Sequence, residues 1–243
     1  MRGRAAAGQA VIAWLGEYDV TDRLEAVLFD MDGLLVDTEP LWFETETEVM
    51  ARLGAPWSKA DQERLLGGSM RHTVGYLLAK ATRPATPAEV ARWMMEGMLR
   101  RAAAGRVVIR PGARELLTEV AVAGIPHALV TGSQREFTEA VVASTGLTFT
   151  VTVTGDDVTR PKPDPEPYLL AAKLLDAVPE NCVALEDSPN GVTAATAAGC
   201  QVIAVPSLIP IPEARGRLVV PSLSVISLAT LRALSARSSK PSP

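Results

Sequence analysis

Cysteine, histidine and aromatic residues are scarce in this chain of 243 residues: there are two cysteines and two histidines, and aromatic residues make up 5% of the total. Cys182 and Cys200 are too few for the disulfide framework of a small secreted domain. Both lie in or beside apolar runs, so we expect reduced thiols in the core and a reducing, cytoplasmic location. Zinc chemistry is not favoured, because no histidine or cysteine is placed with a plausible partner ligand.

Long apolar runs are also missing. No stretch approaches the roughly 20 residues that a helix needs to cross a bilayer, so no membrane association is expected. The apolar centre of residues 10–15 is too short for a signal peptide. A surplus of positive charge is absent too, since 24 Lys and Arg face 28 Asp and Glu for a net charge of −4. This balance argues against nucleic acid as a partner but leaves room for a small anionic metabolite.

Short apolar segments alternate with helical patterns from about residue 108 onward. This order is typical of an α/β protein with a doubly wound parallel sheet. The segments are apolar at consecutive positions, which indicates strands covered on both faces. The expected strands are 26–29, 127–131, 149–153, 182–186, 201–205 and 218–220.

Residues 40–105 interrupt that rhythm with helical patterns and no convincing strand. We therefore predict a Rossmann-like core formed by residues 23–39 and 106–236, with residues 40–105 inserted as an α-helical cap domain. The insert follows the first strand directly, so we expect it to act as a lid over the strand ends. Residues 1–22 are expected to be a poorly ordered extension, and residues 237–243 a disordered tail.

Acidic residues follow the first expected strand, which ends at Phe29 and is continued by Asp30 and Asp32. The carboxyl end of a strand in an open parallel sheet is where ligands bind. Taken alone, Asp-x-Asp-Gly is as typical of an ordinary loop as of a site, and Asp37-Thr38-Glu39 is equally suited to capping a helix.

Three further strand ends or neighbouring loops carry distinctive polar residues: Thr131, Lys162, and the pair Glu186 and Asp187. Right-handed crossovers bring all of these ends to one edge of the sheet. Four acids gathered there would repel one another unless a cation lay among them, and oxygen ligands favour Mg²⁺. The sequence therefore predicts a magnesium site at that edge.

These segments resemble the four motifs of the haloacid dehalogenase superfamily, in the subgroup with a helical cap after the first strand. The motifs are DxDGxLxDTE at residues 30–39, an apolar run ending at Thr131, KPxP beginning at Lys162, and EDSxxG at residues 186–191. The resemblance covers roughly residues 24–225. It is specific for the superfamily and much less so for the substrate.

The resemblance implies a role for each matching residue. Asp30 would be the nucleophile that forms an aspartyl-phosphate, and Asp32 the general acid and base. Thr131 and the amides of Gly132 and Ser133 would bind the phosphoryl group, and Lys162 would offset its charge. The implied Mg²⁺ ligands are Asp30, the backbone carbonyl of Asp32, Asp187 and Glu186, the last directly or through water.

Other activities of the superfamily fit less well. Dehalogenases lack the second aspartate that Asp32 supplies, and phosphonatases need a cap lysine, for which Lys59 and Lys80 have no recognisable context. A β-phosphoglucomutase-like enzyme would carry cap arginine and histidine residues where this chain has Met70 and Trp42, unless Arg71 replaces the arginine. We therefore expect hydrolysis of a small phosphorylated metabolite such as a sugar phosphate. A sugar phosphomutase and a catalytically silent binding or regulatory relative remain the alternatives.

Cap residues are expected to read the leaving group of the substrate. The candidates are Glu39, Trp42 and the segment 67–71, which ends with Arg71. Of the histidines, His127 is interpreted as structural, whereas His72 fits either a solvated helix face or a substrate contact. We expect a monomer, with a dimer as the alternative.

Overall fold

The computed structural model describes residues 23–65, 69–214 and 216–236, which divide into two compact units. The first unit consists of three segments: the chain up to Val36, Ile109–Ser133, and the chain from Leu147 onward. The second comprises Asp37–Val108 and Gln134–Gly146, so it includes a segment that the sequence analysis assigned to the core. The expected extension at 1–22 and tail at 237–243 lie outside the described residues.

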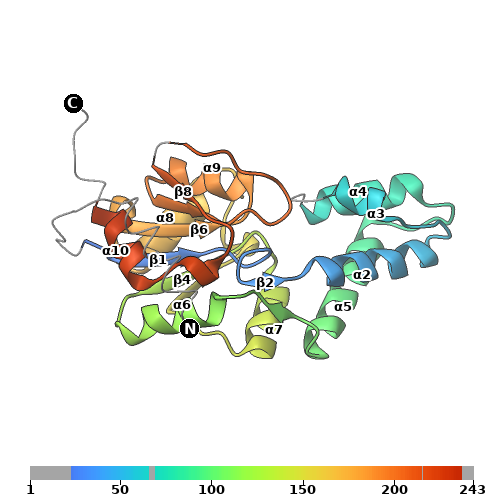
Figure 1. Cartoon of the computed structure of the whole chain (residues 1–243). Coiled ribbons are helices and arrows are strands. Elements are labelled where there is room, and N and C mark those ends of the chain that lie inside the picture. Colours follow the sequence, from blue (N-terminus) through green and yellow to red (C-terminus); the bar gives the residue numbers. More distant parts are fainter. Residues whose placement is uncertain (1–22, 66–68, 215, 237–243) are drawn as a thin grey trace. The chain divides into compact units, whose positions relative to one another are not determined.

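The first unit contains a six-stranded sheet in which all the neighbouring strands are parallel (Figure 1). The strand order is β5-β4-β1-β6-β7-β8, so β1 lies near the centre, with β4 and β6 on either side. This arrangement confirms the predicted doubly wound parallel sheet. The strands are β1 Ala26–Phe29, β4 His127–Val130, β5 Val151–Val153, β6 Cys182–Glu186, β7 Gln201–Ala204 and β8 Arg217–Val219.

Helices cover both faces of this sheet, which is why its central strands are buried and apolar at consecutive positions. Helices α8 and α9 share one apolar core with the strands, and α6 and α10 pack together on the other face. The helices of this unit are α6 Ala113–Val122, α8 Glu166–Leu174, α9 Pro189–Ala197 and α10 Leu228–Ala236, with 3₁₀ turns η1 Gly155–Asp157, η2 Pro179–Asn181 and η3 Leu223–Val225.

The register of the central strands decides where the polar residues lie. Phe29 at the end of β1 is level with Leu129 on β4 and Leu185 on β6. The next residue of each strand is therefore at the same height, which places Asp30 beside Glu186. The carboxyl ends of three neighbouring strands thus deliver their polar residues to one edge of the sheet.

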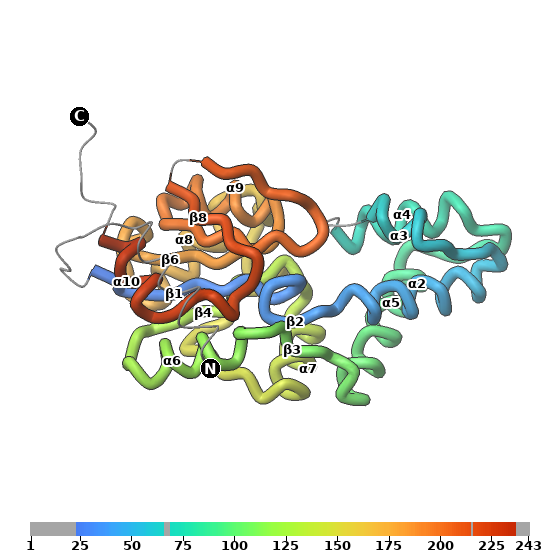
Figure 2. The backbone as a smooth tube through the Cα atoms, viewed as in Figure 1, coloured from blue at the N-terminus to red at the C-terminus, as the bar shows by residue number. Residues whose placement is uncertain are grey.

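The second unit is helical and has its own apolar core, formed by residues such as Val49, Leu77 and Met94. Capping boxes at Ser58 and Thr86 fix the starts of two of its helices. Strands β2 Val36–Asp37 and β3 Val108–Ile109, where the chain enters and leaves the insert, pair with each other (Figure 2). The helices are α2 Glu39–Arg52, α3 Lys59–Glu63, α4 Met70–Lys80, α5 Pro87–Ala103 and α7 Arg135–Thr145.

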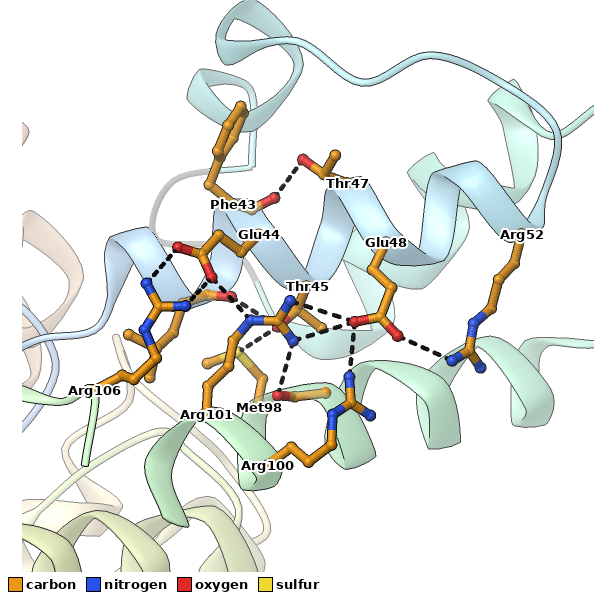
Figure 3. Close-up of polar contacts among 12 residues, drawn as sticks. Phe43, Glu44, Thr45, Thr47, Glu48, Arg52, Met98, Arg100, Arg101 and Arg106 are labelled. Atoms are coloured by element: carbon orange, nitrogen blue, oxygen red, sulfur yellow. Dashed lines mark hydrogen bonds and ion pairs between the residues drawn. The ribbon is translucent and has the colours of Figure 1, made fainter. Parts of the chain in front are cut away.

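Ion pairs join α2 to α5 and the segment that follows it (Figure 3). Arg101 bonds Glu44 at 3.2 Å and Glu48 at 3.3 Å, while Arg106 pairs with Glu44 at 2.6 Å and Arg100 with Glu48 at 2.7 Å. The hydrogen bond from Arg106 lowers the pKa of Glu44. Most of these groups are solvated, so the pairs orient the two helices more than they stabilise them.

None of the helices in the described ranges is long and apolar enough to span a membrane.

Glu46 is the exception among the acids of α2, because it is 2% exposed. Its Oε2 accepts a hydrogen bond of 3.1 Å from the Trp57 indole, and no ion pair is recorded for it within the described part of the chain. Burial, aided by the charge of Glu39 and opposed by the bond from Trp57, raises the pKa of Glu46 to about 7. A buried carboxylate without a cation is costly once it ionises.

We therefore expect Glu46 to make stability depend on pH. The raised pKa means that the folded chain holds a proton that the unfolded chain releases at about pH 4.3, so stability is lost as the pH rises from there through about 7. Glu46→Gln should remove this loss. Its stability relative to the parent should therefore be higher at pH 8 than at pH 4 by about 3 kcal/mol. Urea unfolding at the two pH values measures it. Glu96→Gln, which changes an exposed acid of α5, is the control; an equal effect of both variants would contradict the expectation.

Candidate active site

Lys162 connects two of the acids at the carboxyl edge of the sheet. Its Nζ donates to Asp30 Oδ1 at 2.6 Å, to Glu186 Oε1 at 2.5 Å and to the Val130 carbonyl at 3.0 Å, which uses all three protons. The loop before α8 carries this lysine, and the Lys162–Pro163 peptide bond is cis. Burial lowers the pKa of Lys162, but the charges of Asp30 and Glu186 outweigh it and raise that pKa overall. Lys162 is therefore a fixed positive charge.

Asp30, Glu186 and Asp187 form a buried acidic cluster, in which one carboxylate oxygen of each lies within 4.8 Å of the others. Burial raises the pKa of Asp30 well above its usual range; Lys162 opposes this rise, and the neighbouring acids add to it. Burial and Glu186 likewise raise the pKa of Asp187 to about 7. A cation among these oxygens would relieve the repulsion, and an all-oxygen donor set suits Mg²⁺. The residues thus fit the metal that the sequence predicted.

Asp32 lies on the loop after β1, where hydroxyl groups hold its side chain. Ser133 Oγ donates to Asp32 Oδ2 at 2.7 Å, and Thr131 Oγ1 donates to the same oxygen at 3.2 Å. The Ser133 amide donates to Thr131 Oγ1 at 3.0 Å. The Thr131 hydroxyl and the Ser133 amide, both predicted to contact a phosphoryl group, are thus bonded within the protein. Gly132 lies between these two residues.

Two residues at this edge were missed by the sequence analysis. The buried Tyr168 hydroxyl of α8 bonds Glu186 Oε1, and the Lys162 ammonium lies 5.1 Å from the centre of its ring. Ser207, beyond β7, donates to Asp187 Oδ2 at 2.5 Å. The position of Tyr168, in the helix that directly follows the KPxP lysine, was the available signal for the first. No pattern marked Ser207.

The remaining candidates belong to other segments of the chain. Glu39, Trp42 and Arg71 belong to the second unit, where Gln62 donates to Glu39, Trp42 contacts Phe137 edge to face, and Arg71 is exposed. The proposed residues 67 and 68 of the segment 67–71 are outside the described residues. His127 contacts the backbone carbonyls of Ile125 and Thr148 at the opposite end of β4, as expected of a structural histidine.

Known proteins share both the sequence pattern and this fold. The model of the haloacid dehalogenase-like hydrolase family matches residues 27–205, and the chain belongs to this family. The match contains every strand end that contributes to the cluster. Related curated proteins include phosphatases, and the chain is an enzyme of this class, a phosphoric monoester hydrolase.

Three relatives illustrate the likeness. A phosphorylated carbohydrates phosphatase of Thermotoga maritima is 38% identical over 74% of this chain and 84% of its own length. Hexitol phosphatase A of Escherichia coli is 35% identical over 75% of this chain and 83% of its own. The crystal structure of a CbbY mutant from Rhodobacter sphaeroides with xylulose-(1,5)bisphosphate is 32% identical, with a TM-score of 0.77, covering 86% of this chain and 99% of that one.

Gly191 in α9 tests how tightly the cluster is built. A Cβ added there would lie 1.9 Å from the Glu186 carboxylate, so Gly191→Ala must displace Glu186 and with it Lys162. We expect kcat/KM for a phosphate ester to fall by about tenfold or more, since such placement errors are costly in catalysis.

Gly75→Ala is the matched control, because a Cβ there meets nothing within 4 Å in the exposed face of α4. It should leave kcat/KM unchanged and raise stability by up to about 1 kcal/mol. Phosphate release and thermal unfolding measure both variants. Full activity of Gly191→Ala would show that Glu186 does not need its present position.

Proposed function

We propose that this enzyme is a Mg²⁺-dependent phosphatase of a phosphorylated carbohydrate and that it acts through an aspartyl-phosphate. The observation that carries the proposal is the buried contact of Lys162 with Asp30, next to the acidic cluster with Asp187. The names of the relatives support the substrate class, since they include phosphorylated carbohydrates and hexitols. These small polyol monoesters suit a chain with no basic surplus.

Asp30 and Asp32 divide the chemistry in this proposal. An oxygen of Asp30 attacks phosphorus, the bond from phosphorus to the sugar oxygen breaks, and Asp32 gives that oxygen a proton. Asp32 then takes a proton from water as the water oxygen attacks the aspartyl-phosphate, which releases inorganic phosphate and restores Asp30. The hydroxyls of Ser133 and Thr131 keep the Asp32 side chain aimed at one place.

Lys162 and Thr131 would assist the phosphoryl group. The fixed charge of Lys162 offsets negative charge that builds on the transferring oxygens, and its bond to Asp30 keeps the nucleophile in place. Thr131 would exchange its bond to Asp32 for one to a phosphoryl oxygen, with the Gly132 and Ser133 amides beside it. The Ser133 hydroxyl would keep its shorter bond to Asp32 and continue to orient that carboxyl group.

Asp30, Asp187 and the backbone carbonyl of Asp32 would hold Mg²⁺, with Glu186 as a direct or water-mediated ligand. The bound ion would supply charge neutralisation for the approach of one anion to another. Glu186 already accepts hydrogen bonds from Lys162 and Tyr168, so we assign it a second role as the anchor of the lysine.

The second unit would select the leaving group, through Glu39, Trp42 and Arg71. Trp42 and Met70 both pack against the apolar core of this unit. Such packing disfavours a second phosphate site at these positions, and therefore favours water over a sugar phosphate as the acceptor. Hydrolysis is thus preferred to mutase chemistry.

A substrate panel tests the function. Sorbitol 6-phosphate, xylulose 1,5-bisphosphate and p-nitrophenyl phosphate should each release phosphate with Mg²⁺ and much less after chelation. The sugar phosphates should be preferred by about tenfold in kcat/KM, because contacts to the leaving group lower their barrier. Asp30→Asn should abolish turnover.

Phosphate release by the parent enzyme that is no faster than release by Asp30→Asn would favour the catalytically silent relative. Glucose 6-phosphate formed from β-glucose 1-phosphate and a bisphosphate primer faster than free phosphate would favour the mutase.

Asp32→Asn separates the two acids. The amide that replaces this carboxyl group cannot protonate a sugar leaving group, so kcat for sugar phosphates should fall by about 100-fold or more, in line with the worth of a general acid. Asp30 should still be phosphorylated by an ester with a good leaving group. Acid quenching and peptide mapping by mass spectrometry locate the phosphoryl group, and its discovery on a residue other than Asp30 would refute the assignment.

A further inference from the structure

Three distant segments of the chain meet at one oxygen of Asp187. Ser207, three residues beyond β7, donates its hydroxyl to Asp187 Oδ2 at 2.5 Å. Gly33, on the loop after β1, has a φ of +84°, and a Cβ there would lie 2.0 Å from that oxygen and 2.9 Å from Ser207 Oγ. Only glycine permits so close an approach in this backbone conformation.

Ser207 makes the hydrogen bond that orients this carboxylate. Lys162 gives its three protons to Asp30, Glu186 and the Val130 carbonyl, so none remains for Asp187. Among the described residues, the Ser207 hydroxyl is the group that donates a hydrogen bond to the Asp187 side chain, and it donates to Oδ2. The second oxygen, Oδ1, is thereby left to serve another partner.

The chemistry of a hydroxyl matters at this place. A lysine or arginine there would orient Asp187 as well, but its charge would cancel the negative charge that attracts a divalent cation. The serine hydroxyl fixes the carboxylate and adds no charge. Removal of a group that donates a hydrogen bond to a metal ligand commonly weakens metal affinity by roughly 10- to 100-fold.

We propose that Ser207 is a positioning residue for the metal site, which holds Asp187 by Oδ2 so that Oδ1 can ligate Mg²⁺. This inference rests on the proposed function, because it takes Asp187 to be a Mg²⁺ ligand. It extends the site to the segment after β7, outside the four motifs. Ser207 acts through Asp187 and does not itself contact the substrate.

Isothermal titration calorimetry with Mg²⁺ tests the inference on the full-length protein. Ser207→Ala should raise the dissociation constant by about tenfold, as loss of a partner behind a metal ligand predicts. Its kcat at saturating Mg²⁺ should return to within about threefold of the parent, because added metal compensates for a weaker site. Ser144→Ala, which removes an exposed hydroxyl from α7, is the control and should bind Mg²⁺ as the parent does.

Ser207→Thr and Ser207→Val form a second, matched pair, since they have nearly the same volume and differ in the hydroxyl. The threonine variant should bind Mg²⁺ more tightly than the valine variant by about tenfold. Equal Mg²⁺ affinity of the two, or an unchanged affinity in Ser207→Ala, would overturn the role of Ser207. This pair decides the matter even if the alanine variant folds poorly.

The failure of this inference can be told apart from that of the proposed function. A parent protein that binds Mg²⁺ and hydrolyses sugar phosphates, with Ser207→Ala identical to it, would refute only the role of Ser207. A parent protein that neither binds Mg²⁺ nor releases phosphate would refute the proposed function, and the present inference with it. Loss of activity in Ser207→Ala that excess Mg²⁺ does not restore would also count against metal positioning.

Discussion

Buried negative charge at the carboxyl edge of the sheet is the constraint on which the rest of the site depends. Asp30, Glu186 and Asp187 lie together out of water, and among the described residues the ammonium group of Lys162 is paired with two of them. Three carboxylates and one ammonium group leave an excess of negative charge, and burial raises the free-energy cost of that excess. In the function proposed above, a bound cation would neutralise this excess and so allow an anionic phosphate ester to approach.

Neighbouring hydroxyl groups also hold the acids at this edge by hydrogen bonds. Tyr168 bonds Glu186, Ser207 bonds Asp187, and Ser133 bonds Asp32, so each of these acids meets a neutral hydroxyl. Neutral donors orient the carboxylates without reducing their charge. The glycines Gly33 and Gly191 make room for this crowding, since a Cβ at either position would collide with an acid.

The fold was predictable because its signals are local. Apolar strands such as Ala26–Phe29 and capped helices such as Pro189–Ala197 follow from composition and turn residues alone, and right-handed crossovers then bring Asp30, Lys162 and Glu186 to one edge. Ser207 was not predictable, because a serine in a loop carries no periodic signal and its contact is 20 residues away in the chain. The grouping of α7 with the helical insert depends on packing against α5, which no local pattern encodes.

The pairing of β2 with β3 has a consequence for how such enzymes diversify. The chain leaves the sheet domain at Val36 and returns at Ile109, and these two crossings lie side by side. Because the two ends of the inserted segment are paired, the segment between them can change in length without moving the strands of the sheet. Mutation, replacement or resizing of the segment from 39 to 107 can therefore proceed in evolution while the reaction chemistry, encoded in separate stretches of sequence, is inherited intact.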